Sequence, residues 1–418
     1  MLDDFAVPSG HAPRRCAAGA GGRWRAGRFA PAELAGLAAR LAERGGRALA
    51  ALPLERRLAA WDGAVGALLD PESVERRALL PELVGTSRLS PEGLSEALEI
   101  VLGGWHGEAA AALAARARAA PDPALAGVVL AANVPGLAAQ SLLPALLAGR
   151  PLLVKSALAE PLFAPALVAA LAAREPALGD AFAAVAFAGD DAAATVAAFG
   201  GVARLLAYGG APALAALAAR FGHRLVAQGP KASVALVGRD VDALEVGRGL
   251  ARDVALLDQR GCLSVHAVWV EGDAREAAEA LAFGLAIEAR RLPPGPADPQ
   301  ALAAVQQWRG AAELGDALIG RLEALEGTVV LTLDADFHPS PGLRAVRVHA
   351  VAEIGDALAP LCRWRGSLQG AALAGGAAEE LGSALAALGI SRLAAPGELQ
   401  AADAGWENGG VDPFAVFA

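Results

Sequence analysis

The sequence predicts an α/β protein built around parallel sheets, and three observations support this. From residue 127 onwards, short apolar runs alternate with helical stretches. Strands joined through helices become parallel neighbours in a sheet that helices cover on both faces. Small, polar or basic residues follow several of these runs, which is where such sheets bind ligands. A chain of 418 residues can also hold two or three domains, each with its own core.

The first 120 residues are predicted to form a helical region. Apolar residues recur at helical spacing over 31–49, 54–69 and 91–105, with a proline near the start of each stretch. No strand pattern is evident within residues 1–115. Alanine supplies much of the 55% hydrophobic share of the chain, and it is a strong helix former.

The strand pattern divides the rest of the chain. Residues 121–238 are predicted to form a first parallel-sheet domain, 239–390 a second α/β domain and 391–418 a C-terminal segment, after a helical region of residues 1–120. The expected strands are 127–132, 151–155, 184–189, 203–208, 223–227, 232–238, 265–271, 327–334, 345–351 and 368–375. The proline-rich stretch 292–300 is expected to be a surface loop.

Charge and cysteine content narrow the class of protein. The net charge of -9, without any dense Lys/Arg run, argues against nucleic acid as a partner. Three cysteines do not make a disulfide framework, and no Cys/His spacing typical of a metal site occurs. No signal-peptide pattern opens the chain, and no apolar run reaches the ~20 residues that span a bilayer. We expect a cytoplasmic protein without a membrane span and without a metal.

Cys262 is a candidate nucleophile. It follows a predicted helix through the polar loop Asp-Gln-Arg-Gly and precedes a strong strand pattern, so its backbone is fixed while one side of the thiol is exposed. Arg260 is near enough in sequence to favour the thiolate, which is the reactive form. A lone cysteine is more often a small buried hydrophobic residue. That is our interpretation of Cys362, and Cys16 is expected in a disordered tail.

Asn133 follows the first strand of the sheet domain. Attack on an acyl group needs hydrogen-bond donors at the developing oxyanion, and the amide of Asn133 with the backbone N–H of Cys262 would supply them. The alternative is an asparagine that serves only the turn before a proline.

Other candidates follow later strands of the same sheet. Lys155, with Ser156 beside it, ends an apolar strand, where its ammonium group either meets a hydroxyl or phosphate of a ligand or emerges into solvent. Gly189 also follows a strand. The pair Gly209 and Gly210 would let a phosphate approach the N-terminus of the next helix, although the full Gly-x-Gly-x-x-Gly pattern is absent.

In this order, the residues resemble the aldehyde dehydrogenase superfamily. Residues 132–162 are similar to its segment from the oxyanion asparagine to the lysine that contacts the cofactor ribose. Residues 205–214 are similar to its phosphate-proximal turn, and 229–242 to the Gly-Gly-Lys stretch before its catalytic domain. Loop 258–264 then stands where the superfamily has its nucleophile. The resemblance covers residues 125–395.

Within the superfamily, the chain most resembles the acyl-CoA reductases that make long-chain aldehyde for bacterial luciferase. Residues 259–264 are similar to their nucleophile loop, 368–375 to a late strand and 389–397 to a terminal element. The resemblance implies a Rossmann-type cofactor domain, a catalytic domain with Cys262 as nucleophile, and reduction of a fatty acyl thioester to an aldehyde. It implies Asn133 as oxyanion donor and NADPH, with NADH possible, as cofactor. The cofactor contacts that it implies are Lys155, Ser156, Gly189, Gly209 and Gly210.

The resemblance also suggests partners. The substrate would be acyl-CoA or another acyl thioester, an acyl-transferring protein could deliver it, and the protein would be a homo-oligomer. The sequence leaves the acyl chain length and the donor open, because alanine-rich walls do not reveal the size of a tunnel.

Departures from the superfamily pattern refine these expectations. Simple aldehyde dehydrogenases carry a glutamate that activates water for thioester hydrolysis; the chain has Ala227 there, so the acyl group is expected to leave by reduction or thiol exchange. Leu158 replaces an acid that reads the adenosine ribose, which favours NADPH, although Glu160 is close enough to counter this. A second ribose-contacting glutamate has no counterpart near 340, and His266 is expected to be structural.

Two alternatives stay open. One is a γ-glutamyl-phosphate-type reductase, which also lacks the base and would accept an acyl phosphate. The other is a catalytically silent subunit that binds a partner.

Overall fold

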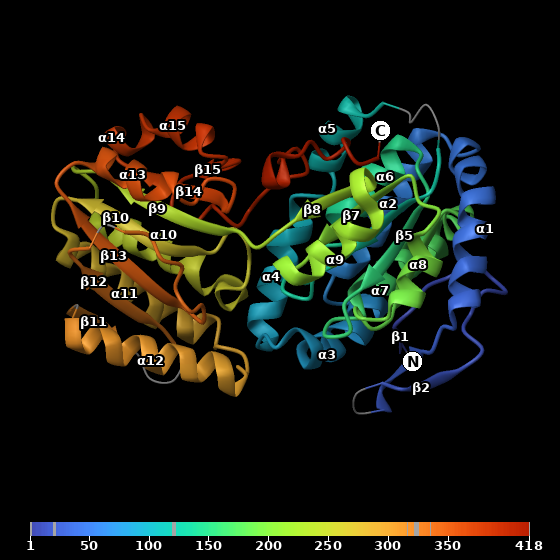
Figure 1. The fold of residues 1–418 in the computed structure, drawn as a ribbon, viewed down its shortest axis with the longest axis horizontal. Coiled ribbons are helices and arrows are strands. Elements are labelled where there is room, and N and C mark those ends of the chain that lie inside the picture. Colours follow the sequence, from blue (N-terminus) through green and yellow to red (C-terminus); the bar gives the residue numbers. More distant parts are fainter. Residues whose placement is uncertain are drawn as a thin grey trace.

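A computed structural model describes residues 2–19, 22–118, 123–315, 317–321, 326–334 and 336–417. Two sheets form its frame, one on each side of Figure 1. The first has five strands, all parallel, in the order β6-β5-β4-β7-β8. Their bounds are β4 (Ala126–Val129), β5 (Leu152–Ser156), β6 (Phe182–Ala186), β7 (Arg204–Tyr208) and β8 (Leu225–Gln228).

Helices connect these strands, as the alternating pattern predicts. The connecting helices are α6 (Ala139–Ala148), α7 (Phe163–Arg174), α8 (Ala192–Phe199) and α9 (Ala211–Phe221), with 3-10 turns at Pro176–Asp180 and Gly222–Arg224. Every residue of β5 and β6 is buried, because the sheet is covered on both faces. The carboxyl ends of the strands therefore meet along one edge, where the connecting loops can form a site.

The second sheet has seven strands in the order β11-β12-β13-β10-β9-β14-β15. Only β11 runs antiparallel to its neighbour. The strands are β9 (Ala232–Val237), β10 (Val265–Glu271), β11 (Ala317–Arg321), β12 (Thr328–Thr332), β13 (Ala345–Val351), β14 (Leu368–Ala374) and β15 (Arg392–Ala394). The helices of this domain are α10 (Ala243–Ala255), α11 (Ala274–Arg291), α12 (Pro299–Gly315), α13 (Leu358–Cys362), α14 (Gly376–Glu379) and α15 (Gly382–Ala387).

One predicted boundary is wrong. Residues up to 238 were expected in the first domain, but β9 pairs with β10 and β14 in the second sheet. The crossing from one sheet to the other therefore falls between β8 and β9, at residues 229–231. A single buried strand carries no sign in its own sequence of which sheet it will join.

The N-terminal region holds more than the expected helices. Its helices are α1 (Pro31–Ala50), α2 (Leu54–Leu69), α3 (Val74–Ser87), α4 (Pro91–Gly103) and α5 (Glu108–Arg116). A small sheet of three strands precedes them: β1 (Leu2–Asp3), β2 (Cys16–Ala18) and β3 (Trp24–Gly27). Cys16 lies in β2 and is exposed, so the expectation of a disordered tail there is wrong. Cys362, at the end of α13, is also exposed, so the interpretation of it as a buried hydrophobic residue is wrong. Ala6 bridges to Ala184 of β6, which attaches this region to the edge of the first sheet.

The C-terminal segment returns from the second domain to the first (Figure 1). Leu399 and Trp406 pack in the core of the second domain. Phe414 and Phe417 pack in the core that the N-terminal helices share with the first sheet. The carbonyl of Phe417 accepts a hydrogen bond from Arg150 Nε at 2.6 Å. This segment therefore ties both domains together.

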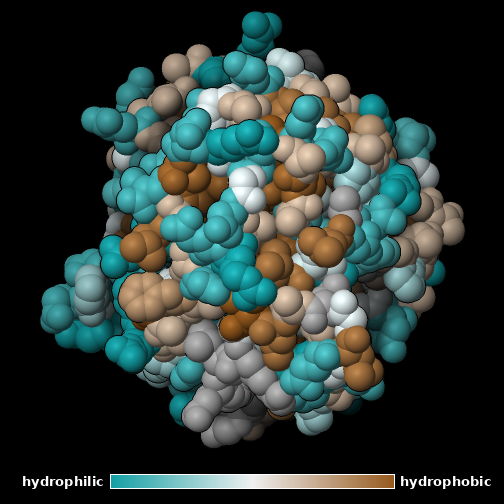
Figure 2. Space-filling view, turned by 90° about the vertical axis from the view of Figure 1, so that its left-hand side faces the viewer, coloured by the Kyte–Doolittle hydropathy of each residue, from teal (hydrophilic) through white to brown (hydrophobic). Residues whose placement is uncertain are grey.

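None of the helices in the described ranges is long and apolar enough to cross a bilayer. Figure 2 shows the outer end of the second domain, where hydrophobic side chains are scattered among hydrophilic ones. Within the described residues, no cluster of His, Cys, Asp or Glu could hold a metal ion.

Candidate active site

A cavity of about 310 Å³ lies between the carboxyl edge of the first sheet and the loop before β10. The loops after β4, β7 and β8 contribute to it from the first domain, and the loop that carries Cys262 contributes from the second. Its lining includes Asn133, Tyr208, Gly209, Gly210, Gln228, Lys231, Arg260, Cys262 and Asn408. Residues from widely separated parts of the chain thus surround one space.

Cys262 lies half-buried in this lining. Burial raises the pKa of its thiol to about 11; the backbone N–H of Cys262, the charge of Lys231 and the backbone N–H of Leu263 counter part of this rise. The carbonyl of Cys262 accepts a hydrogen bond from Ser233 Oγ at 2.9 Å. The backbone of Cys262 is therefore held in place, and its side chain is mostly a thiol at neutral pH.

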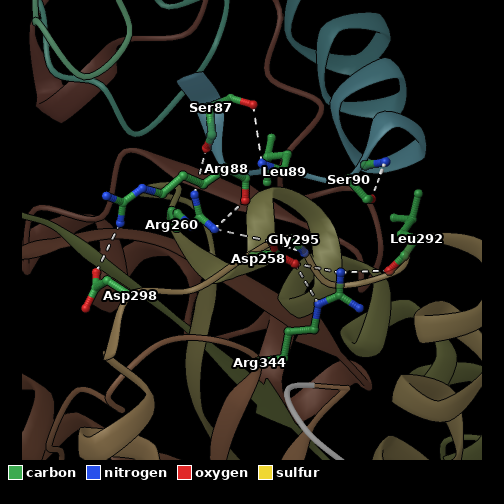
Figure 3. A network of polar contacts seen from close by, with 11 residues as sticks. Ser87, Arg88, Leu89, Ser90, Asp258, Arg260, Leu292, Gly295, Asp298 and Arg344 are labelled. Atoms are coloured by element: carbon green, nitrogen blue, oxygen red, sulfur yellow. Dashed lines mark hydrogen bonds and ion pairs between the residues drawn. The ribbon is translucent and has the colours of Figure 1, made fainter. Parts of the chain in front are cut away.

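Arg260 does not act on the thiol as the sequence suggested. Its Nη1 donates to the carbonyl of Ser87 and its Nη2 to the carbonyl of Arg88, both at 2.7 Å. The guanidinium group therefore faces the end of α3 (Figure 3). The expectation that Arg260 favours the thiolate is wrong, and Lys231 is the cation that lowers the pKa of Cys262.

Asn133 lies in the loop after β4 and is exposed to the cavity. Its Nδ2 donates to the carbonyl of Arg260 at 2.9 Å, two residues before Cys262. A side-chain amide has two N–H groups, so one remains for a ligand. The structure thus brings Asn133 to the cysteine loop, as a shared oxyanion site would need.

Lys155 and Ser156 end β5 farther along the same edge of the sheet and do not line this cavity. Burial lowers the pKa of Lys155, whose Nζ lies 5.2 Å from the ring centre of Phe187 and 3.3 Å from the carbonyl of Ser156. The hydroxyl of Ser156 is buried, and no described residue bonds to it. A buried amine and an unsatisfied hydroxyl fit contacts to a polar ligand such as a dinucleotide.

The three candidate glycines border open space. At Gly189, no atom lies within 4 Å of where a Cβ would stand. At Gly209 and Gly210 the nearest atoms lie 3.7 and 3.9 Å away. Gly210 is the residue before α9, so the helix N-terminus faces the cavity with room for a phosphate beside the backbone. Gly189 lies outside the cavity lining, whereas Gly209 and Gly210 belong to it.

Glu160, which is close in sequence to the leucine that replaces a ribose-contacting acid, binds backbone groups instead. Glu160 is buried, and its Oε1 accepts from the backbone N–H groups of Leu162 and Phe163 at the start of α7, both at 2.9 Å. Leu158 is exposed. Glu160 therefore caps a helix. The cavity that Leu158 lines also contains three acidic residues, Asp4, Glu33 and Asp191, and three basic residues, Arg14, Arg15 and Arg28.

Tyr208, Lys231 and Asn408 were not predicted as site residues. Burial, and then the nearby Cys262, raise the pKa of Tyr208, the single tyrosine of the chain. Asn408 donates to Gln140 Oε1 at 2.8 Å and lies in the C-terminal segment. Tyr208 ends a predicted strand, and Lys231 belongs to the stretch 229–242 that resembles the Gly-Gly-Lys segment of the superfamily. Their positions could therefore have identified them as site residues from the sequence. The position of Asn408 carried no such signal, because only the return of the C-terminal segment brings it here.

A second cavity, of about 410 Å³, shares Lys231 and Arg260 with the first. His266 lines it and lies 2.9 Å, through Nδ1, from the hydroxyl of Ser340. Burial lowers the pKa of His266 to about 4, so the ring is neutral. His266 therefore borders the loop of Cys262 without lining the cavity that contains the thiol.

Comparison with known proteins identifies a family and a fold. The model of the family described as acyl-CoA reductase (LuxC) matches residues 108–418. A search of curated protein sequences finds no match.

Solved structures show the fold. The chain is similar to an NAD-dependent benzaldehyde dehydrogenase from Corynebacterium glutamicum (TM-score 0.69, 16% identity, covering 89% of this chain and 87% of that one). It is also similar to a Mycobacterium tuberculosis aldehyde dehydrogenase complexed with NAD+ (0.67, 17%, 89% and 84%). A third is the NADP-dependent glyceraldehyde-3-phosphate dehydrogenase from Bacillus halodurans C-125 complexed with NADP (0.69, 15%, 89% and 84%). The aldehyde dehydrogenase fold predicted from the sequence is confirmed.

Proposed function

The chain belongs to the acyl-CoA reductase (LuxC) family, and we propose that it reduces a fatty acyl thioester to an aldehyde with NADPH, through an acyl group carried on Cys262. One observation carries the proposal. The thiol of Cys262, the amide of Asn133 and the Gly209-Gly210 turn surround one cavity, and no carboxylate is among its lining residues in the described chain. Such a site can form a thioester and has no side chain to activate water against it.

In the first step the sulfur of Cys262 bonds to the carbonyl carbon of the acyl donor, and the bond from that carbon to the donor's sulfur breaks. The proton of the Cys262 thiol passes to the departing thiol, so the step consumes no acid or base. The free amide N–H of Asn133 and the backbone N–H of Cys262 stabilise the negative charge on the carbonyl oxygen. Lys231 favours the attacking thiolate.

The second step is a reduction on Cys262. A bound nicotinamide cofactor supplies the hydride. The acyl carbon then carries an alkoxide beside the cysteine sulfur; the carbon–sulfur bond breaks, the aldehyde leaves, and Cys262 takes up a proton. Asn133 stabilises the alkoxide as it did in the first step. Because Ala227 is no base, hydrolysis of the acyl-enzyme is expected to be slow.

The cofactor contacts are proposed along the strand ends of the first sheet. Lys155 and the unpaired hydroxyl of Ser156 would bind the ribose, and Gly189 would leave space for the adenosine. The Gly209-Gly210 turn would bind the phosphates. NADPH is favoured over NADH because Leu158 exerts no repulsion on a 2′-phosphate and Glu160 is engaged in capping α7.

The intact mass of the protein tests the proposal. Incubation with acyl-CoAs of several chain lengths, without cofactor, is expected to add one acyl group at Cys262, and added CoA is expected to remove it. The Cys262→Ser variant should gain no acyl group that CoA removes. The matched variant Cys362→Ser, which changes an exposed cysteine outside the site, should react like the parent.

Two outcomes contradict the proposal in different ways. If an acyl phosphate modifies Cys262 and no acyl-CoA does, the substrate class is that of the acyl-phosphate reductases. If neither donor modifies Cys262 at any chain length, the covalent mechanism is wrong.

A further inference from the structure

The backbone before Cys262 adopts an unfavourable conformation. Leu257, Asp258 and Gln259 have φ angles of 58°, 48° and 61° in succession. This is the left-handed region, in which the Cβ of an L-residue crowds the backbone, and it is rarely occupied by three non-glycine residues in a row. Such a conformation persists only where the surrounding structure holds it in place.

A buried ion pair holds the middle residue of this turn. Arg344 Nη2 and Nε donate to Asp258 Oδ1 at 2.7 and 3.0 Å, and the two side chains are 2% and 4% exposed. The backbone N–H of Gly295 donates to Asp258 Oδ2 at 3.0 Å. The backbone of Arg344 is also in the left-handed region, with φ 61°. Two strained turns, one before β10 and one before β13, thus face each other and are joined by the pair (Figure 3).

The two residues that follow Asp258 in the chain are held by hydrogen bonds as well. Gln259 Nε2 donates to the carbonyl of Ala345 at 2.8 Å, and its Oε1 accepts from the N–H of Ala345 at 2.9 Å. Arg260 reaches the carbonyls of Ser87 and Arg88. Gly295 passes so close to this contact that a Cβ there would stand 2.1 Å from the carbonyl oxygen of Arg88. Three elements therefore converge on the turn that precedes the nucleophile.

The pair is a poor device for stability alone. Two buried charges lose their hydration, and a well-packed apolar pair of the same volume often stabilises a fold as well or better. Arg344 Nη1 is moreover buried without a partner among the described residues. What the pair adds is direction, because two guanidinium donors meet Oδ1 of the carboxylate while the backbone N–H of Gly295 holds Oδ2, and together they fix its orientation. The contact therefore points to a role in geometry.

The orientation of the turn determines whether Asn133 can hydrogen-bond to the loop that carries Cys262. The carbonyl of Arg260 accepts the amide of Asn133, and Arg260 follows the left-handed turn directly. If Asp258 and Gln259 relaxed to right-handed angles, that carbonyl would rotate away from Asn133, and Cys262 would shift relative to the amide. Resting on the function proposed above, we infer that Asp258 and Arg344 are positioning residues, whose buried pair keeps Cys262 aligned with Asn133 for attack on the acyl group.

The variant Arg344→Lys tests this inference, because lysine keeps the charge and cannot present two fixed donors to Asp258 Oδ1. The rate of acyl transfer from acyl-CoA to Cys262, measured by intact mass, is expected to fall by roughly 10- to 100-fold, the range that a misplacement of about 1 Å produces. Asp258→Asn, which keeps the size of the side chain, should act in the same direction and replaces Arg344→Lys if that variant does not fold.

Arg309→Lys is the matched control. Arg309 is also buried in the second domain, where its Nε donates to Thr328 Oγ1 at 2.8 Å, outside the turn before Cys262. It is expected to lower the melting temperature as Arg344→Lys does and to leave the acylation rate within about twofold of the parent. An acylation rate that Arg344→Lys leaves unchanged, or that Arg309→Lys lowers equally, overturns the positioning role.

A second measurement separates this inference from the proposed function. Alkylation of Cys262 by iodoacetamide against pH needs no acyl substrate. Relaxation of the turn in Arg344→Lys is expected to expose the thiol and to move the profile to lower pH by roughly half a unit or more, since desolvation is what raises its pKa. If the parent forms no acyl adduct, the proposed function fails and this profile alone decides: a shift supports the positioning role, and an unmoved profile overturns it.

Discussion

Cys262 combines a fixed backbone with a thiol that is protonated at neutral pH. Burial outweighs the charge of Lys231 and two backbone N–H groups, so the pKa of the free thiol stands at about 11. The sulfur would react through a small thiolate fraction, which suits an intrinsically strong nucleophile. Lys231 was recognised in sequence only as part of a Gly-Pro-Lys stretch, and its effect on the thiol follows from the loop that the second domain brings to it.

The rate of Cys262 alkylation should therefore depend strongly on pH. Between pH 7 and 10 the rate constant with iodoacetamide is expected to rise about tenfold for each unit, since the thiolate fraction does so below the pKa. Removing the cation in Lys231→Met should raise the pKa further and lower the rate at pH 8 by about three- to tenfold. Peptide mapping by mass spectrometry measures the rate at this one cysteine; a plateau reached below pH 9 would contradict the raised pKa.

Short loops between strand and helix place most of the proposed cofactor contacts. The Gly209-Gly210 turn connects β7 to α9 and leaves open space beside the backbone. Gly210 has φ -70°, which any residue can adopt, so its lack of a side chain serves the space beside it and no unusual backbone angle.

Gly210→Ala should therefore affect binding more than stability. Its Cβ would meet its nearest atom at 3.9 Å, an ordinary contact, and would occupy the space proposed for a phosphate. The Kd for NADPH is expected to rise about tenfold, or ~1.4 kcal/mol, with the melting temperature nearly unchanged. Gly201→Ala, in the turn before β7 and also facing open space, is the control that should leave both values unchanged. Equal affinity in the parent and Gly210→Ala would argue against a phosphate at this turn.

The sequence was least informative for elements without a clear pattern. Helix α3 contains Pro81 and has little amphipathic character, and α12 follows a proline-rich stretch that suggests a loop. The strands β1 to β3 have two to four residues each, too few for a period to show. Longer strands such as β10 and β13 have the predicted bounds, because apolar residues fill most of their seven positions and leave few alternatives.

The whole molecule depends on a C-terminal segment that crosses both domains. Phe417 is 1% exposed and packs with the N-terminal helices and the first sheet. Asn408 on the same segment hydrogen-bonds Gln140 beside the cavity and accepts from Gln228 at 3.1 Å. The packing of this segment therefore supports both the contact between domains and one wall of the site.

Phe417→Ala should destabilise the protein. Loss of a fully buried phenylalanine costs about 3–5 kcal/mol, which should appear as a clear drop in melting temperature. Phe283→Ala is the matched control, since Phe283 on α11 is 53% exposed and its removal should change stability by no more than about 0.5 kcal/mol. Equal melting temperatures for the two variants would show that the end of the chain is not part of the core.

The sequence alone determined the fold class and the places of most strands along the chain, because apolar runs and their spacing depend on local burial that each segment carries with it. It also determined which residues are candidates: Cys262 stands out by its type in a loop before a strand, and Asn133 and the Gly209-Gly210 turn stand out by type and by place after a strand. Only the tertiary structure decided which residues these candidates contact. The structure places Lys231, and not Arg260, beside the thiol, and it uses Glu160 as a helix cap. It also joins Asp258 and Arg344 in a buried pair at the turn before the nucleophile. These contacts depend on the direction in which each side chain points in the folded molecule, and local sequence does not determine that direction.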